Sequence, residues 1–178
     1  MMSRTMTEAL LPKRVDGKRL VDNNQQLIGI IDTNSLTRLS DAIVRGELPV
    51  ECHLDFGRDQ ERFLVVTGHC SSRVVMTCQR CLQDVGIDIK GDFHLGLVLN
   101  DEQAKKLPRY LEPVEMDEKG YLDVYAAVED EVLLCLPDFP MHEQGECQAF
   151  ISDQGDNESA DEFKRENPFE VLAQLKQK

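Results

Sequence analysis

Residues 50–99 alternate apolar and polar side chains, which is the period of a β-strand. The alternation occurs in runs at 52–56, 64–78 and 87–99, and residues typical of turns separate these runs. A short apolar run at 27–31 adds a further strand. A flat sheet of so many consecutive strands would leave long edges with unpaired backbone groups, which is unfavourable. The pattern therefore predicts a curled antiparallel sheet, or a partly closed barrel, of about five or six strands.

Two main helices are expected to accompany the sheet, which makes the predicted fold class α+β. Asn34 or Ser35 can cap a helix that runs to about Arg45. Asp123 can cap a second helix, which Pro137 ends. Within the strands, Gly68 predicts either a bend or a junction of two strands. The second helix is expected to lie across the sheet and close the core.

The sequence predicts three parts. Residues 1–142 have the length and patterning of a single domain, within which residues 1–26 are irregular. Residues 143–166 contain 8 acidic and 2 basic side chains with few large apolar groups, as in a flexible acidic linker. Residues 167–178 fit a short amphipathic helix, which would fold back on the domain or dock on a partner.

The net charge of −13 constrains the partners. Residues 101–178 carry nearly all of the excess, with 20 acidic and 8 basic side chains. So acidic a chain repels a phosphate backbone, which argues against DNA and against RNA binding by bulk charge. Any RNA contact would need a local basic patch, and Arg14, Lys18 and Arg19 are candidates, although they also fit a solvated surface. The acidic half would suit a basic partner, such as a ribosomal protein.

No apolar run is long enough to cross a bilayer, and the N-terminal residues lack the apolar segment of a secretory signal. We therefore expect a cytoplasmic protein without membrane contact. In that compartment its six cysteines are expected to be reduced thiols or metal ligands rather than disulfides.

Cys78 and Cys81 form a Cys-x-x-Cys motif, a spacing that lets two thiolates bind one tetrahedral zinc ion from a tight turn. His142 and Cys147 are the best candidates for the other two ligands, because they lie in a stretch with little else to bury. Reduced, partly buried cysteines remain the alternative. A thioredoxin-like redox site is disfavoured, because its motif would follow a parallel strand.

No pattern indicates an enzyme. Glu129, Asp130 and Glu131 could supply paired carboxylates for acid–base or Mg²⁺ chemistry, as a nuclease would need. Adjacent residues on a helix do not face one another, so a solvated acidic face is favoured instead. The sequence contains no glycine-rich phosphate loop, zinc-protease motif or nucleophile elbow.

Three blocks in order resemble the bacterial YceD family, the large ribosomal RNA subunit accumulation proteins. They are the Cys-Gln-Arg-Cys segment at 78–81, the segment 128–137 that ends in Leu-Pro, and Asn-Pro-Phe at 167–169 with Leu172. The likeness spans nearly the whole chain. It implies a non-catalytic cytoplasmic factor in ribosome biogenesis, needed for the synthesis, processing or stability of 23S rRNA. Many members have several cysteines after the Leu-Pro, where this chain has only His142 and Cys147.

The preferred hypothesis is an adaptor that holds a ribosomal or ribosome-assembly protein, with the precursor of large-subunit rRNA as a further candidate partner. A direct RNA-binding module and a ribonuclease acting on precursor rRNA are the alternatives. The candidate contact residues are Arg14, Lys18, Arg19, Arg80, Glu129, Asp130, Glu131, Phe169 and Leu172.

Overall fold

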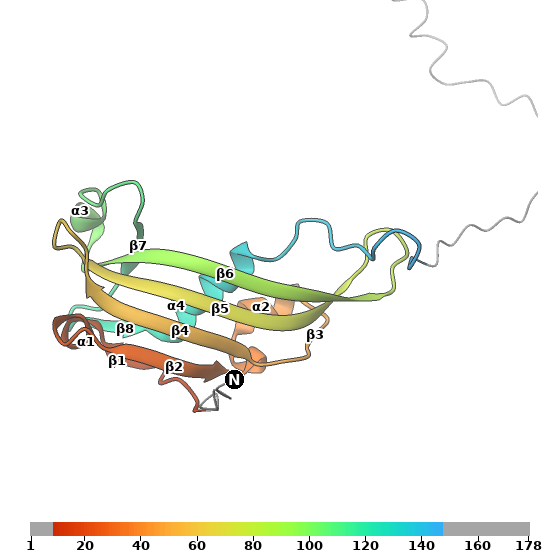
Figure 1. Ribbon diagram of the computed structural model, residues 1–178, viewed down its shortest axis with the longest axis horizontal. Helices are drawn as coiled ribbons and strands as arrows, with labels where there is room; N and C mark the ends of the chain where they lie inside the picture. The colour runs from red at the N-terminus through yellow and green to blue at the C-terminus, as the bar shows by residue number, and fades with distance from the viewer. Residues whose placement is uncertain (1–8, 148–178) are drawn as a thin grey trace, which may run out of the picture. The chain divides into compact units, whose positions relative to one another are not determined.

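The computed structural model describes residues 9–147 and confirms an α+β fold (Figure 1). Its main sheet has six strands, in the order β2-β4-β5-β6-β7, with β3 paired to β5 off this path. The strands are β2 (Gln26–Ile31), β3 (Arg45–Gly46), β4 (Val50–Arg58), β5 (Leu64–Thr77), β6 (Asp84–Val98) and β7 (Glu112–Glu115). A second sheet pairs β1 (Arg14–Asp16) with β8 (Tyr121–Asp123). The helices are α1 (Gly17–Asp22), the 3-10 turn η1 (Thr33–Ser35), α2 (Thr37–Ala42), α3 (Asp101–Ala104) and α4 (Val124–Leu134).

The predicted partly closed barrel is wrong, because β2 and β7 end the sheet without pairing to each other. The edge of β2 is covered instead by the segment 9–11, where Leu11 N–H donates to Ile30 O at 3.0 Å. The sheet is also not wholly antiparallel, since β7 runs parallel to β6. The sheet can stay open because helices cover one of its faces and bury the apolar side chains there, so that no barrel is needed to form the core.

Strand β5 is one long strand through Gly68, as one of the two predicted alternatives had it, and the other alternative, a junction of two strands, is wrong. Gly68 lies opposite Phe93 of β6, and a Cβ atom at this position would lie 2.0 Å from the Phe93 ring. Glycine is therefore required here for space, so that the aromatic ring can lie across the neighbouring strand. Strand β6 is likewise continuous through Gly91.

Helix α4 begins as predicted, because the Asp123 side chain accepts a hydrogen bond from Ala126 N–H at 3.0 Å. Its buried side chains Val124, Val128 and Val132 join the apolar core of the sheet. The predicted cap of the first helix is wrong, because Asn34 and Ser35 lie in the 3-10 turn η1 and Leu36 precedes α2. Helix α2 is also shorter than expected and ends at Ala42. Figure 1 shows α2 and α4 on the same side of the sheet.

The segment expected to be irregular before residue 26 contains β1 and α1. Asp16 caps α1 by accepting a hydrogen bond from Arg19 N–H at 2.9 Å. Strand β1 is only three residues long and pairs with β8, more than 100 residues later. Three residues are too few to show the apolar–polar alternation of a β-strand, and the distant partner of β1 cannot be inferred from local sequence.

Several predictions fall beyond the described part of the chain. They are the linker after residue 147, the C-terminal helix at 167–178, and the contact candidates Phe169 and Leu172. Among residues 9–147, no helix is both long and apolar enough to cross a membrane.

Candidate metal centre

The Cys-x-x-Cys motif occupies the turn between the two longest strands, β5 and β6. Cys78 N–H donates to Gln83 O at 2.8 Å and closes the turn, while Leu82 N–H donates to Cys78 O at 2.9 Å. Leu82 adopts a positive φ of 60°, which reverses the chain within this short loop. Cys78 and Cys81 are both buried, and with Val85 they form a small core separate from the main one.

The chain after α4 brings His142 and Cys147 to this turn. Pro137 ends the helical pattern, and Gln79 N–H then donates to Pro140 O at 2.9 Å, which docks the loop against the turn. The Arg80 guanidinium donates to the carbonyl oxygens of His142 and Glu143, both at 3.4 Å. Arg80, predicted as a partner contact, thus also joins the two segments of the site.

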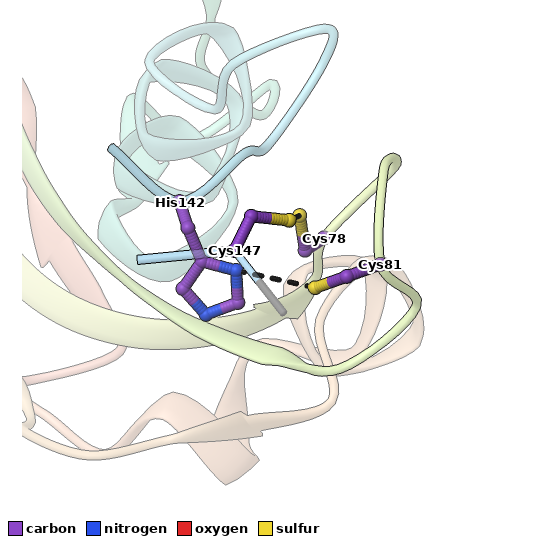
Figure 2. A group of neighbouring side chains, drawn as sticks. All are labelled: Cys78, Cys81, His142 and Cys147. Atoms are coloured by element: carbon purple, nitrogen blue, oxygen red, sulfur yellow. Dashed lines mark hydrogen bonds between the residues drawn. The ribbon is translucent and has the colours of Figure 1, made fainter. Parts of the chain in front are cut away.

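The four side chains converge, as Figure 2 shows, and their ligand atoms all lie within 4.8 Å of one another. The Sγ atoms of Cys78 and Cys147 are 3.8 Å apart, and Cys81 Sγ lies 3.4 Å from His142 Nδ1. In a tetrahedral zinc site, bond lengths of about 2.3 Å to sulfur and 2.0 Å to nitrogen place S···S near 3.8 Å and S···N near 3.5 Å. Three thiols and one imidazole at these separations fit a structural zinc site.

The opposite ring nitrogen of His142 is held in the manner usual for a metal-ligating histidine. His142 Nε2 lies 3.0 Å from Asp84 O, the carbonyl at the start of β6. A proton on Nε2 that is donated to this oxygen leaves Nδ1 unprotonated and facing the sulfur atoms. Asp84 was not singled out from the sequence, because a backbone carbonyl that orients a ligand leaves no signal in residue type.

Electrostatics also favour a cation at this position. Burial opposes ionisation of Cys78, but N–H groups of Cys81, His142 and Arg80 bond its sulfur and lower its pKa to about 5. Burial likewise opposes ionisation of Cys147, whose pKa is nevertheless lowered, with the Arg80 side chain the main cause. The thiolates raise the pKa of His142. Metal binding would displace the remaining protons and neutralise the thiolate charge.

The other three cysteines lie apart from this group. Cys52 and Cys70 face each other on β4 and β5 and are buried in the main core. Burial raises the pKa of each of these two thiols to about 12, which makes them poor metal ligands. Cys135 packs against the same core.

The predicted basic patch is partly neutralised. Arg14 pairs with Asp117, and its guanidinium lies 4.6 Å from the centre of the Tyr121 ring. Lys18 and Arg19 are exposed on α1. Figure 1 places α1 at the end of the sheet opposite the β5–β6 turn, so these bases are remote from the metal centre.

The three carboxylates of α4 have different environments, whereas the sequence predicted one solvated face. Glu129 is buried and accepts hydrogen bonds from Arg38 and Leu39 of α2. Asp130 is exposed and pairs with the Arg38 guanidinium. Glu131 is half-buried, and burial followed by the like charges of Glu112 and Asp130 raises its pKa. Arg38 could not be predicted as the partner, because it lies 91 residues before Glu129.

Comparison with known proteins decides the family. The family model described as "Large ribosomal RNA subunit accumulation protein YceD" matches residues 66–176, more than half of the chain. The chain is also 33% identical over 174 residues to the protein of that name from Haemophilus influenzae, covering 97% of this chain and all of the relative. The chain belongs to the YceD family.

The part matched by the YceD model contains all four residues of the metal centre, together with β6 and α4. The relative from H. influenzae aligns with nearly the full chain, so the similarity extends to the N-terminal strands that precede the matched part. No solved structure matches this YceD protein.

Proposed function

We propose that this protein supports the accumulation of large-subunit ribosomal RNA, as a cytoplasmic factor of ribosome biogenesis. The observation that carries the proposal is the full-length similarity to the relative from H. influenzae named for that role. Loss of the protein should lower 23S rRNA relative to 16S rRNA. Normal 23S rRNA in cells lacking the protein would contradict the proposal.

We further propose that it acts as a non-catalytic adaptor for a ribosomal or ribosome-assembly protein. The net charge of −13 favours a basic protein over bare RNA as the direct partner. The carboxylates that a ribonuclease would need have other bonds, since Glu129 is held by α2 and Asp130 by Arg38. Burial and the like charges of Glu112 and Asp130 raise the pKa of Glu131, and among the described residues it has no basic partner.

Affinity capture from lysate with and without RNase separates these mechanisms. An adaptor should retain a ribosomal or assembly protein after RNase treatment. RNA in the untreated capture, together with the loss of all captured proteins after RNase, would favour direct RNA binding by the exposed basic residues of α1. A ribonuclease would instead cleave precursor rRNA, and Glu131→Ala would abolish that cleavage while the fold stayed intact.

We propose zinc as the occupant of the site formed by Cys78, Cys81, His142 and Cys147. The ligand separations support a tetrahedral ion, and four protein ligands leave no open position for a substrate. Zinc would therefore have a structural role. It would fasten the loop that follows α4 to the β5–β6 turn, where few apolar side chains could do so.

A further inference from the structure

Strand β6 has a long edge without a neighbouring strand. It spans fifteen residues, but β7 pairs only with Leu95–Val98. Within the described chain, no strand lies beside the preceding part of β6 on that side. Figure 1 shows β6 along the margin of the sheet, with β7 beside one end. A free edge presents a row of unpaired backbone N–H and C=O groups to other chains.

The backbone groups that face this edge can be identified from two bonds. Asp84 O lies 3.0 Å from His142 Nε2, and Val98 O accepts a hydrogen bond from Met116 N–H at 2.8 Å, so both carbonyls point away from β5. The pairing of β5 with β6 contains no bulge between these ends. Even-numbered residues therefore direct their backbone groups outward. We call four of them the β6 edge: Gly86, Asp88, Lys90 and Asp92.

The residues of the β6 edge are exposed. The Asp92 side chain is 88% exposed and the Asp88 side chain 65% exposed, and Gly86 and Lys90 are exposed as well. No backbone partner of these residues on the outer side lies within residues 9–147. The opposite margin of the sheet differs, because the segment 9–11 already bonds the edge of β2.

Negative charge gathers where the β6 edge meets β7. Glu112 is the first residue of β7, and it acts electrostatically on Glu131 of α4. Glu131 lies one helical turn before Cys135, whose N–H donates to Glu131 O at 3.2 Å, and the Cys135 sulfur lies beside Gly91, the neighbour of Asp92 in β6. Neither Glu112 nor Glu131 forms an ion pair with any described residue. An incoming lysine or arginine side chain would supply the missing charge.

An apolar surface adjoins the same place. The Sγ atom of Cys135 packs against Gly91 of β6, where a Cβ atom would lie only 2.5 Å from it. The preceding residue, Leu134, ends α4 and is 73% exposed. An added strand would turn alternate side chains toward this helix end and toward solvent. On the helix side the added strand would meet Glu131 and Glu112 as well as Leu134, so its basic residues would occupy the positions that face α4 and its apolar residues the alternate ones.

We propose that the β6 edge binds an extended lysine- or arginine-rich segment of a partner protein by strand addition. Backbone hydrogen bonds to Gly86, Asp88, Lys90 and Asp92 would provide much of the affinity, and Glu131 and Glu112 would select basic side chains. The inference rests on the proposed function in one respect, since the adaptor role is what calls for a basic protein partner.

A defined peptide tests the proposal on the full-length protein. The probe is a ten-residue peptide of alternating lysine and valine, measured by fluorescence anisotropy beside its glutamate–valine counterpart and a copy with methylated backbone nitrogens. The lysine peptide should bind, more weakly as salt is added. Methylation should weaken binding about tenfold or more, because it removes the backbone donors. Equal binding of the methylated or the glutamate peptide would overturn strand addition.

Hydrogen exchange locates the contact. The amides of Gly86, Asp88, Lys90 and Asp92 should exchange rapidly in the free protein and slowly with the lysine peptide bound. Protection of these amides before any peptide is added would overturn the proposal, because the chain itself would then cover the edge. Protection confined to other residues would also overturn it.

Two variants separate backbone pairing from charge. Lys90→Pro removes an outward N–H that β5 does not use, and proline is tolerated at strand edges. It should weaken binding about fivefold or more. Because this substitution also removes a positive charge, electrostatics alone would strengthen binding. Glu131→Gln should weaken binding about threefold, whereas the control Glu118→Gln, which removes the same charge from an exposed turn, should leave it unchanged.

Failure of this site is distinguishable from failure of the proposed function. If the lysine peptide does not bind, or if Lys90→Pro and Glu131→Gln bind it as well as the native protein does, the strand-addition site is overturned while the rRNA measurement is unaffected. Normal 23S rRNA in cells lacking the protein would contradict the ribosomal role even if the peptide bound as expected.

Discussion

The carboxylate of Glu129 in α4 caps the helix that contains Arg38. Glu129 Oε1 accepts hydrogen bonds from Arg38 N–H at 2.8 Å and from Leu39 N–H at 3.2 Å, while Oε2 accepts from Arg38 Nε at 3.0 Å. Helix α2 has no cap of its own, since Leu36 stands at that position. A buried acidic side chain from a distant helix thus satisfies the first N–H groups of α2 and fixes α2 against α4.

Glu129→Ala should therefore destabilise the fold. The substitution leaves two helix N–H groups without an acceptor and removes a partner of Arg38, with an expected loss of about 2 kcal/mol in the free energy of unfolding. Urea denaturation followed by circular dichroism measures the change. The control is Asp130→Ala, which removes an exposed partner of the same arginine and should cost less than about 0.5 kcal/mol. Equal losses in the two variants would contradict the capping role.

Removal of the metal should loosen the site without unfolding the main core. The purified protein is expected to carry about one zinc ion, and chelation should lower Tm by roughly 5 °C or more. Cys78→Ser and Cys81→Ser should lose the metal, whereas the control Cys135→Ala should keep it, because Cys135 lies outside the cluster. Zinc-free native protein whose Tm does not respond to chelator would contradict zinc binding.

Gly68→Ala should destabilise the sheet. The added methyl group would overlap the Phe93 ring, which lies across from it on β6, and overpacking of this kind costs about 1–3 kcal/mol. Gly57→Ala is the matched control in a neighbouring strand, since its Cβ atom would meet only Asn24 at an ordinary 3.5 Å. Thermal unfolding of both variants tests this, and a Gly68→Ala protein as stable as the Gly57→Ala protein would refute it.

Glu131→Gln should stabilise the isolated protein in a pH-dependent way. Burial and the charges of Glu112 and Asp130 raise the pKa of Glu131 above its ordinary 4.5, so the ionised form is penalised in the fold at neutral pH. The amide removes that penalty, with an expected gain below about 1 kcal/mol for this half-exposed group. The gain should vanish as pH falls below 4.5, where the carboxyl is protonated in both folded and unfolded chains. A gain that persists in acid would contradict this cause.

The sequence predicted the features that depend on local apolar–polar alternation and on residue type. The alternation around Leu64–Thr77 identified the long strands, and Asp123 identified the start of α4. The Cys-x-x-Cys spacing with His142 and Cys147 identified the four side chains that converge in the candidate metal site. Its errors concern contacts between distant segments. The open margin of the sheet depends on which strands pair, and a local pattern does not contain that information.

Glu129 illustrates the same limit within the candidate site. The sequence alone does not distinguish the three adjacent acidic residues of α4. Their burial nevertheless differs, because Glu129 faces α2. The carbonyl of Asp84 that orients His142 is equally invisible, since every residue has a carbonyl group.

The ratio of 23S to 16S rRNA in cells depleted of this protein tests its role most directly. We expect the ratio to fall on depletion, to recover with the native gene, and to recover poorly with Cys78→Ser, because the proposed zinc ion would hold the region beside the β6 edge. A ratio that stays normal throughout depletion would contradict a role in the accumulation of the large ribosomal subunit.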